Sequence, residues 1–562
     1  MTQPPDVATA PPDRSGPGWG PLVVLSIAQF VMVLDQSVMN VSISQLVEDF
    51  DTSVTVIQGV ITLYSLVMAT LMLTGGKVGD LLGRRRAFVI GLAIYAAGSA
   101  LTAGAWSVGS LVAGWSVLEG IGAALVLPAL VALIATTYEG PARVAAFGVI
   151  GGVSGAGIAA GPIIGGWFTT ELSWRWVFVG EVVLVLVILA TSRLLPADRR
   201  DRVVPSLDWV GSILTVVGLG MVVLGVLQAG EWGWLAPRSS PITPFGFSLT
   251  PFVVGGGFAV LAGFVRWERH RTARGRDPLV DLSLFSVAPL RAGLMTMLSM
   301  NTILLGVFFT LPLYLQVVLG FDALDTGIRM LPISVAMFVL SASGPRLVRR
   351  FSPRTIVRVG FVALCLAVVV MMGTIETDLR GFVFGVGLTL LGAGMGLIAS
   401  QVGNVIQGSV GPERRSEAGG LQFTAQQLGS SLGTALIGTV LVAALASASI
   451  NLVNADDRVE DGLAERFSVA VTGNATFVPD EQVNEALLAA GVDEASAGAI
   501  TENYSAAQLT ALKAGLLLAL AIALGSLMVT GRLPDRPLRP DDPTADVPPP
   551  TIPDLAGGAS RA

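Results

Sequence analysis

Fourteen long apolar runs constrain the fold of this chain more than any other feature of its sequence. A helix needs about 20 consecutive apolar residues to cross the hydrocarbon core of a bilayer. Such runs lie at residues 20–45, 56–75, 86–105, 108–137, 143–168, 174–195, 207–229, 250–267, 290–319, 326–346, 354–373, 381–409, 419–446 and 511–531. The sequence therefore predicts an all-α membrane protein with 14 transmembrane helices, and the even number of spans places both termini on one side of the membrane.

The amino-acid composition supports a polytopic membrane protein and argues against several other classes. Charged residues make up 13% of the 562 residues, whereas soluble domains carry about 25%. The single cysteine, Cys365, and the single histidine, His270, provide neither a cysteine metal site nor a histidine proton relay. The sequence shows no phosphate-binding loop of an ATP-driven pump and no Ser–His or metal-ligand cluster. We therefore expect no enzymatic activity, no cofactor and no metal.

The distribution of arginine predicts the orientation in the membrane. The linkers assigned to the cytoplasm carry 21 arginines, and the opposite linkers carry six. Cytoplasmic loops hold the excess of basic residues, so we expect an inner or plasma membrane protein with both termini cytoplasmic. Residues 451–510 hold 11 acidic residues and two arginines, which favours a place outside the cell, with helical pieces at 480–490 and 495–512. Residues 1–19 and 533–562 are predicted to be disordered tails.

The segment Gly76–Arg86, GKVGDLLGRRR, joins two of the apolar runs. We expect a tight glycine-rich turn here, with Asp80 spaced to pair with the arginines or a helix N-terminus. The segment resembles the signature loop of the major facilitator superfamily, G-x-x-x-D-R-x-G-R-R/K, with Leu81 in place of the usual first arginine. The matching residues, expected to act as a gating loop, are Gly76, Asp80, Gly83, Arg84 and Arg85.

Further motifs resemble the fourteen-helix drug:proton antiporter branch of that superfamily. They include Leu34-Asp35-Gln36-Ser37 in the first span, Trp174-Arg175-Trp176-Val177-Phe178 at the start of the sixth and Gln426-Gln427-Leu428-Gly429 in the thirteenth. The resemblance implies two six-helix bundles, at 20–195 and 290–531, with two inserted helices at 207–267 between them. The carboxy-terminal bundle would include the linker 451–510 between its last two helices.

The fifth span carries a stripe of small residues that resembles the antiporter signature G-x-x-x-G-P-x-x-G-G. Small residues let a neighbouring helix pack closely, and a proline permits a bend. The resemblance implies a seam that seals the substrate route, whereas a packing role alone is the alternative. The residues of this antiporter seam are Gly157, Gly161, Pro162, Gly165 and Gly166.

Three acids within the spans are candidates for proton coupling and for binding a cation. Placing an acidic side chain inside the membrane costs free energy, so such a residue is first considered functional. Asp35 and Glu119 reach similar depth at about 1.5 Å per helical residue. Glu181 is expected to lie nearer the surface, where a solvated acid or a partner of Arg175 is the alternative. The chain departs from the family pattern R-x-x-Q at two positions, where it has Ser116 and Glu119. The arginine commonly linked to proton coupling is therefore absent.

Polar residues within the spans are candidates for a substrate cavity, although each one has an alternative as an inter-helix hydrogen bond of about 0.6 kcal/mol. A cavity otherwise rich in Met, Phe and Trp would suit an amphipathic ligand. The candidates are Asn40, Gln58, Tyr64, Asn301, Gln316, Gln422 and Gln426.

Together these features predict a proton-coupled exporter of amphipathic, often cationic, drugs or toxic compounds that works by alternating access. Export of an endogenous lipid, siderophore or secondary metabolite is the alternative, and a non-transporting sensor lacks an obvious output surface. The expected partners are membrane lipid, a small amphipathic substrate and protons, without nucleic acid. We expect a monomer, with residues 451–510 a candidate contact for a partner outside the cell.

Overall fold

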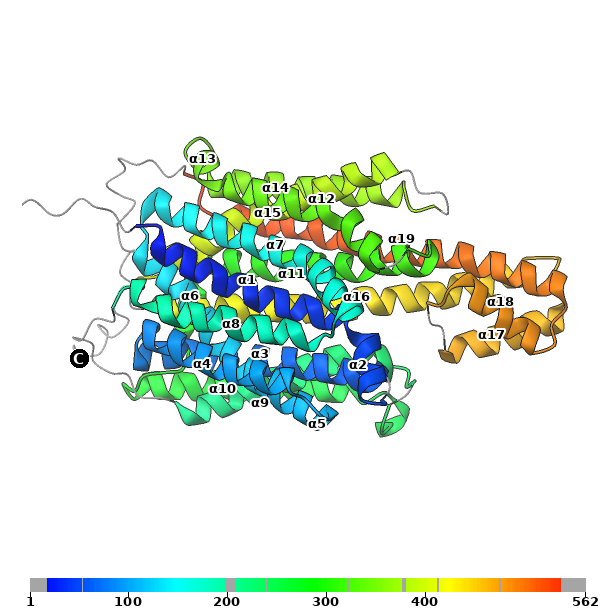
Figure 1. Cartoon of the computed structure of the whole chain (residues 1–562), viewed down its shortest axis with the longest axis horizontal. Helices are drawn as coiled ribbons and strands as arrows, with labels where there is room; N and C mark the ends of the chain where they lie inside the picture. Colours follow the sequence, from blue (N-terminus) through cyan, green and yellow to red (C-terminus); the bar gives the residue numbers. More distant parts are fainter. Residues whose placement is uncertain are drawn as a thin grey trace, which may run out of the picture.

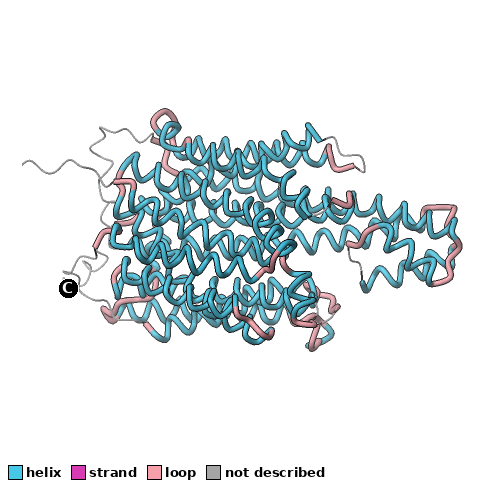
Figure 2. The backbone as a smooth tube through the Cα atoms, in the orientation of Figure 1, coloured by secondary structure: helices cyan, strands magenta, loops and turns pink. Residues whose placement is uncertain are grey.

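The computed structural model describes residues 18–52, 54–197, 208–238, 240–321, 323–376, 381–411, 414–474 and 477–536, and the regular structure in these ranges is helical, without a strand (Figure 2). The two predicted disordered tails lie outside the described residues, apart from 18–19 and 533–536.

The helices follow the order of the apolar runs, with short turns between most of them. They are α1 (Gly20–Val41), α2 (Ile43–Asp49), α3 (Val54–Leu82), α4 (Arg84–Ala103), α5 (Val108–Leu111), η1 (Val112–Glu119), α6 (Gly120–Thr137), α7 (Gly140–Glu171), α8 (Arg175–Thr191), η2 (Ser192–Leu194), α9 (Trp209–Trp232), η3 (Pro244–Gly246), α10 (Thr250–Ala273), η4 (Leu282–Ser286), α11 (Ala288–Pro312), η5 (Leu313–Val318), α12 (Ala323–Ala342), α13 (Gly344–Val348), α14 (Pro353–Met372), α15 (Gly381–Gly408), α16 (Arg415–Asn454), α17 (Asp461–Asn474), α18 (Asp480–Ala489), α19 (Glu494–Val529) and η7 (Thr530–Arg532).

Fourteen helical segments within the described ranges are long and apolar enough to cross a membrane, and they coincide with the fourteen predicted spans. Their burial differs according to their place in the molecule. In the most apolar 18-residue stretch of the span Val108–Thr137, 78% of the residues are buried, against only 17% in that of Thr250–Ala273. The first is therefore central and the second peripheral, with an apolar surface left for lipid. The predicted all-α membrane fold is confirmed.

The spans form two bundles of six. The first consists of α1, α3, α4, η1–α6, α7 and α8, and the second of α11, α12, α14, α15, α16 and α19. Each bundle has its own apolar core, around Leu25 and Phe88 in the first and around Leu364 and Leu516 in the second. The inserted helices α9 and α10 pack on each other, and α9 also packs on α3 and α16.

One end of the molecule carries the start of α1 and the end of α19, and we call it the tail end (Figure 1). At the opposite end, α16, α17, α18 and α19 project beyond the other helices and form what we call the extension. α16 has 40 residues, which is about 60 Å of helix against about 30 Å of hydrocarbon. A small core that includes Val453 and Ile500 holds the extension together. The predicted helical piece at 495–512 is continuous with α19 rather than separate.

The glycine-rich turn is shorter than expected. α3 continues through Gly76 and Gly79 and ends at Leu82, so the predicted end of the second span near residue 75 is wrong. Only Gly83, with φ of 95°, separates α3 from α4. This positive φ is accessible to glycine at little cost, and it allows a one-residue connection between the two spans.

Candidate functional site

Asp35 lies in the middle of the first bundle, on α1, and its side chain is fully buried. The indole nitrogen of Trp115, on η1, donates a hydrogen bond of 2.7 Å to Oδ1 of Asp35. The ring of Trp115 is itself stacked on that of Tyr64 from α3, with centroids 4.4 Å apart and planes 7° from parallel. Oδ2 of Asp35 has no hydrogen-bond partner.

Glu119 ends the π-helix η1 and is also fully buried. Thr102 of α4 donates a hydrogen bond of 3.1 Å to Oε1 of Glu119, whereas Oε2 has no partner. α4 can approach this carboxyl because Gly98 has no side chain: a Cβ atom at Gly98 would lie 2.6 Å from Cγ of Glu119.

Glu181 on α8 is buried, with 1% of its surface exposed. Tyr95 and Ser99 of α4 both point their hydroxyls at Oε2 of Glu181, at 3.3 and 3.4 Å. Both alternatives, a solvated acid near the surface and a partner of Arg175, are wrong. Arg175 instead pairs with Asp49 at 2.6 Å, at the extension end of the bundle.

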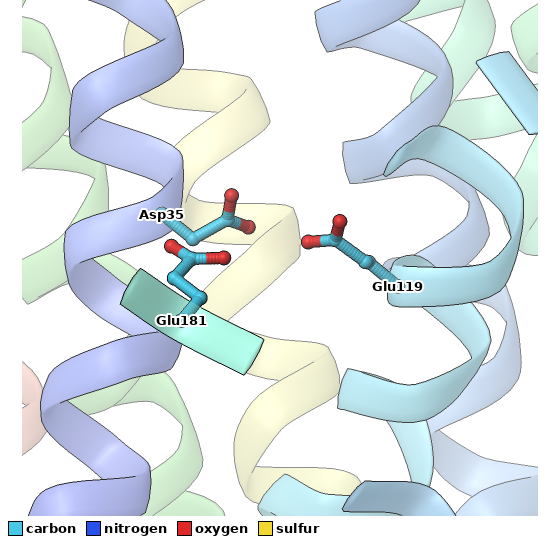
Figure 3. Close-up of side chains that lie close together, drawn as sticks. All are labelled: Asp35, Glu119 and Glu181. Atoms are coloured by element: carbon cyan, nitrogen blue, oxygen red, sulfur yellow. The ribbon is translucent and has the colours of Figure 1, made fainter. Parts of the chain in front are cut away.

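Figure 3 shows the three carboxyl groups pointing toward one another from α1, η1 and α8, and we call them the acid triad. One carboxylate oxygen from each residue lies within 4.8 Å of those of the other two. Each carboxyl accepts a hydrogen bond on one oxygen and leaves the other without a partner. Among the described residues, none of the three forms an ion pair. Three ionised carboxylates so close together would repel strongly in a low-dielectric interior, so the triad favours bound protons or a bound cation.

The donor set suits protons better than a divalent metal ion. Ca²⁺ takes about six to eight oxygen ligands and Mg²⁺ a near-octahedral set, whereas the triad offers three carboxylate oxygens that have no hydrogen bond. Protons shared between neighbouring carboxyls need only these oxygens. The triad can therefore store and release protons with the groups it has.

Ser116 stands where the family pattern has arginine, and its hydroxyl donates a hydrogen bond of 2.8 Å to the carbonyl of Val60 on α3. Residues three apart share a face of an α-helix, which would place Ser116 beside Glu119. The two residues do not share a face here, because Val112–Glu119 is a π-helix, in which each residue turns the chain less. Ser116 therefore faces α3 while Glu119 faces α4, and the serine connects η1 to α3 rather than contacting the glutamate.

The gating loop contains an ion pair between Asp80 and Arg84, with 4.0 Å between their charged atoms. Asp80 is in the last turn of α3 and Arg84 in the first turn of α4, on either side of Gly83. Gly76 and Gly79 are buried within α3, and Arg85 is half-buried. The pair stabilises the turn between the two spans at the tail end.

The antiporter seam packs within the first bundle. A Cβ atom at Gly161 would lie 2.0 Å from Oγ of Ser37, and one at Gly165 would lie 3.1 Å from Val38, both on α1. Gly157 likewise faces Val33 of α1, and Gly166 is half-buried in the same helix. The side chain of Pro162 lies outside the described residues. The seam therefore joins α7 to α1, and the role in sealing the substrate route stays a prediction.

A second group of glycines on α7, which was not predicted from the sequence, joins the two bundles. Cβ atoms at Gly148 and Gly151 would lie 2.5 and 2.6 Å from the carbonyl oxygen and the hydroxyl oxygen of Ser341, on α12 of the second bundle. Gly152 and Gly155 face Phe338 and Met337 of the same helix. The spacing of three and four residues between these glycines is the signal that would have identified the contact.

The seven candidates for a substrate cavity fall into different places. Tyr64 is buried beside the acid triad, Asn301 bonds the carbonyl of Met297 within its own helix, and Gln316 is exposed. Gln422 is buried and Gln426 is half-buried on α16. The side chains of Asn40 and Gln58 lie outside the described residues. The described contacts gather only Tyr64 with the triad, so the substrate cavity stays a prediction.

Two other features of the triad were missed from the sequence. Trp115 was not recognised as the donor to Asp35. Tyr95, Ser99 and Thr102 follow one another at spacings of four and three residues on α4 and present one row of hydroxyls to the two glutamates. A row of hydroxyl residues at helical spacing in an apolar span was the available signal.

Fourteen spans in two bundles, with titratable groups buried inside one of them, are the architecture of a polytopic membrane transporter. The family model of the Major Facilitator Superfamily matches residues 25–434. The chain therefore belongs to the major facilitator superfamily, and its fourteen spans agree with the predicted drug-antiporter branch.

Two curated relatives are similar to this chain in sequence, and one solved structure is similar to it in fold. It is 32% identical to the puromycin resistance protein pur8 of Streptomyces alboniger, over 84% of this chain and 92% of the relative. It is 30% identical to the tetracenomycin C resistance and export protein of Streptomyces glaucescens, over 76% of each chain. The crystal structure of the human organic anion transporter MFSD10 (TETRAN) covers 92% of this chain and 100% of its own, with a TM-score of 0.53 and 15% identity. The prediction of a major facilitator exporter is confirmed by the relatives, and the solved structure confirms the fold.

Proposed function

We propose that the protein exports amphipathic, often cationic, compounds in exchange for protons, and that Asp35, Glu119 and Glu181 carry the protons. The observation that supports this proposal most strongly is the acid triad, with three buried carboxyls and no ion pair among the described residues. A cationic compound that arrives near the triad favours loss of a proton, and its departure favours return of a proton. Such an exchange couples export to the proton gradient.

Alternating access supplies the movement. Among the described residues, side-chain hydrogen bonds link the two bundles at the tail end, including Arg143 to Asn404 at 2.8 Å, Ser341 to the carbonyl of Gly148 at 2.7 Å, and Arg415 to the carbonyl of Ala135. These bonds hold the bundles together at that end and must break when the substrate route opens there. The count of arginines supports a cytoplasmic tail end, so this conformation is closed toward the cytoplasm and the extension lies outside.

The relatives support export of antibiotics or similar toxic compounds, because their names describe resistance to puromycin and resistance to and export of tetracenomycin C. Export of an endogenous lipid, siderophore or secondary metabolite is the second candidate. The extension favours it, because a folded unit outside the membrane offers a surface for a dedicated partner.

Inverted membrane vesicles test the proposed function directly. A panel that includes the lipophilic cation tetraphenylphosphonium is added to vesicles with an imposed gradient, acidic inside. We expect uptake that requires the gradient and stops when a protonophore collapses it. Uptake that is unchanged without the gradient would contradict proton coupling, and absence of uptake for every compound would favour a non-transporting role.

A further inference from the structure

In the described part of the chain, three tryptophan–aspartate pairs are joined by hydrogen bonds. The indole nitrogen donates to the carboxylate in Trp115–Asp35 at 2.7 Å and in Trp174–Asp49 at 2.8 Å. The third pair is Trp267–Asp208 at 2.9 Å, where the inserted helices α9 and α10 meet the tail end. An indole N–H can only donate, so each bond is stronger when the aspartate is ionised.

The surroundings of these aspartates differ in one respect. Arg175 lies 2.6 Å from Asp49, and Arg271 lies 3.3 Å from Asp208. Burial raises the pKa of Asp49, but the hydrogen bonds from Trp174 and Arg175 outweigh it and hold that pKa below its usual value. Asp49 is therefore held in its ionised form by an arginine as well as by an indole, and Asp208 likewise has both an arginine and an indole beside it.

No arginine of the described part of the chain lies beside Asp35. The titratable groups that face it are Tyr64 from α3, Tyr95 from α4, Glu119 from η1 and Glu181 from α8, and none of them is cationic. Trp115 is thus the donor that distinguishes Asp35 from the two glutamates. Those glutamates accept hydrogen bonds of 3.1–3.4 Å from hydroxyl groups. Hydroxyls can turn and accept a bond from a protonated carboxyl, whereas an indole cannot.

We infer that Trp115 is a positioning residue that makes Asp35 the first carboxyl of the acid triad to release its proton. The inference deepens the proposed function and rests on it. It names the residue that decides which of the three acids gives up its proton when the substrate binds. Trp115 favours the ionised form of Asp35, and Glu119 and Glu181 keep their protons over the same range of pH.

The position of Trp115 is well determined by its contacts. Its side chain is 1% exposed and stacked on Tyr64, and the next residue, Ser116, is bonded to Val60. Trp115 and Glu119 share the π-helix η1, and π-helical turns are often found at functional sites. A change of register in η1 would move the indole donor and the carboxyl of Glu119 together, so a movement of this segment would alter two members of the site at once.

Trp115→Phe tests the inference, because phenylalanine keeps an aromatic ring that can pack against Tyr64 and removes the N–H donor together with the five-membered ring that carries it. The pH dependence of proton release on addition of tetraphenylphosphonium is measured on the purified full-length protein in lipid nanodiscs. We expect the midpoint to move to higher pH by about one unit or more, the size of one hydrogen bond to a charged group. The matched controls, Trp174→Phe and Trp267→Phe, remove the same bond at Asp49 and Asp208 and should leave the midpoint unchanged.

Infrared titration of the protonated carboxyl bands provides a second test that does not depend on the stability of Trp115→Phe. The first band lost as pH rises should be absent in Asp35→Asn and present in Glu119→Gln. A midpoint in Trp115→Phe equal to that of the wild type, or a first band that survives in Asp35→Asn, would overturn the inference while proton coupling stands. Absence of any substrate-induced release in the wild type would instead refute the proposed function.

Discussion

Nε of Arg143 on α7 lies 2.8 Å from Oδ1 of Asn404 on α15, and this hydrogen bond joins the two bundles at the tail end. The cationic donor makes it stronger than a bond between neutral groups. In an alternating-access cycle it forms when the tail end closes and breaks when the tail end opens. The bond therefore contributes to the balance between the two conformations rather than to the stability of either bundle.

Arg143→Ala should shift this balance toward the conformation that is open at the tail end. Ser341→Cys in a Cys365→Ala background is a suitable reporter, because Ser341 is fully buried under α7 in the closed conformation. We expect labelling by a soluble maleimide to become several-fold faster when Arg143→Ala is added, as for loss of about 1 kcal/mol. The control is Arg354→Ala, which removes an arginine whose partner, Asp535, belongs to the same half of the chain. Labelling of Ser341→Cys should be unchanged in this control. Equal acceleration in both variants would refute the role of Arg143 in holding the tail end closed.

The glycines between α7 and α12 provide a steric test of closure. A Cβ atom at Gly148 would lie 2.5 Å from the backbone oxygen of Ser341, which cannot turn aside. Gly148→Ala should therefore cost about 1–3 kcal/mol in the closed conformation and lower the export rate by about tenfold. Gly180→Ala on α8 meets nothing within 4 Å and should export at the wild-type rate. Normal export by Gly148→Ala would show that this close approach is dispensable.

Asp80→Asn removes the ion pair with Arg84 across the turn at Gly83. We expect it to impair transport while membrane insertion and ligand binding persist, because the pair stabilises the arrangement of α3 and α4 at the tail end and lies far from the triad. Uptake in vesicles and tetraphenylphosphonium binding in detergent measure the two properties separately. A normal export rate would restrict the loop to a role in topology.

Cysteine labelling tests the orientation in the membrane. Val469 on α17 is 73% exposed in the extension, and Ser286 is exposed at the end of η4, before α11 begins. In a Cys365→Ala background, Val469→Cys should react with an impermeant maleimide added to intact cells, and Ser286→Cys should react only after lysis. Reaction of both cysteines in intact cells would contradict a cytoplasmic tail end.

The spans could be predicted from the sequence because a bilayer dictates the length and polarity of any helix that crosses it. The shared depth of Asp35 and Glu119 followed from the rise per residue. The turn at Gly83 was placed too broadly, since glycines at 76 and 79 were taken to end a helix that packing within the bundle in fact continues.

The details of the acid triad depend on contacts that no spacing along one helix reveals. A π-helix has no distinct sequence pattern, so the divergence of Ser116 from Glu119 could not be foreseen. Glu181 was expected near the surface because its distance along α8 was considered without the row of hydroxyls on α4 that faces it. Donors from a neighbouring helix, not depth alone, explain why a carboxyl can be buried there.

The most direct test of the central claim is the release of protons when a cationic substrate binds. Tetraphenylphosphonium is added to the purified protein in weakly buffered solution, and a pH-sensitive dye reports the protons released. The wild type and Glu485→Gln, an exposed acid of the extension, should release protons; Glu119→Gln should release fewer, and Asp35→Asn should release none. Release of the wild-type amount by a variant that lacks Asp35, Glu119 and Glu181 together would contradict proton coupling through the acid triad.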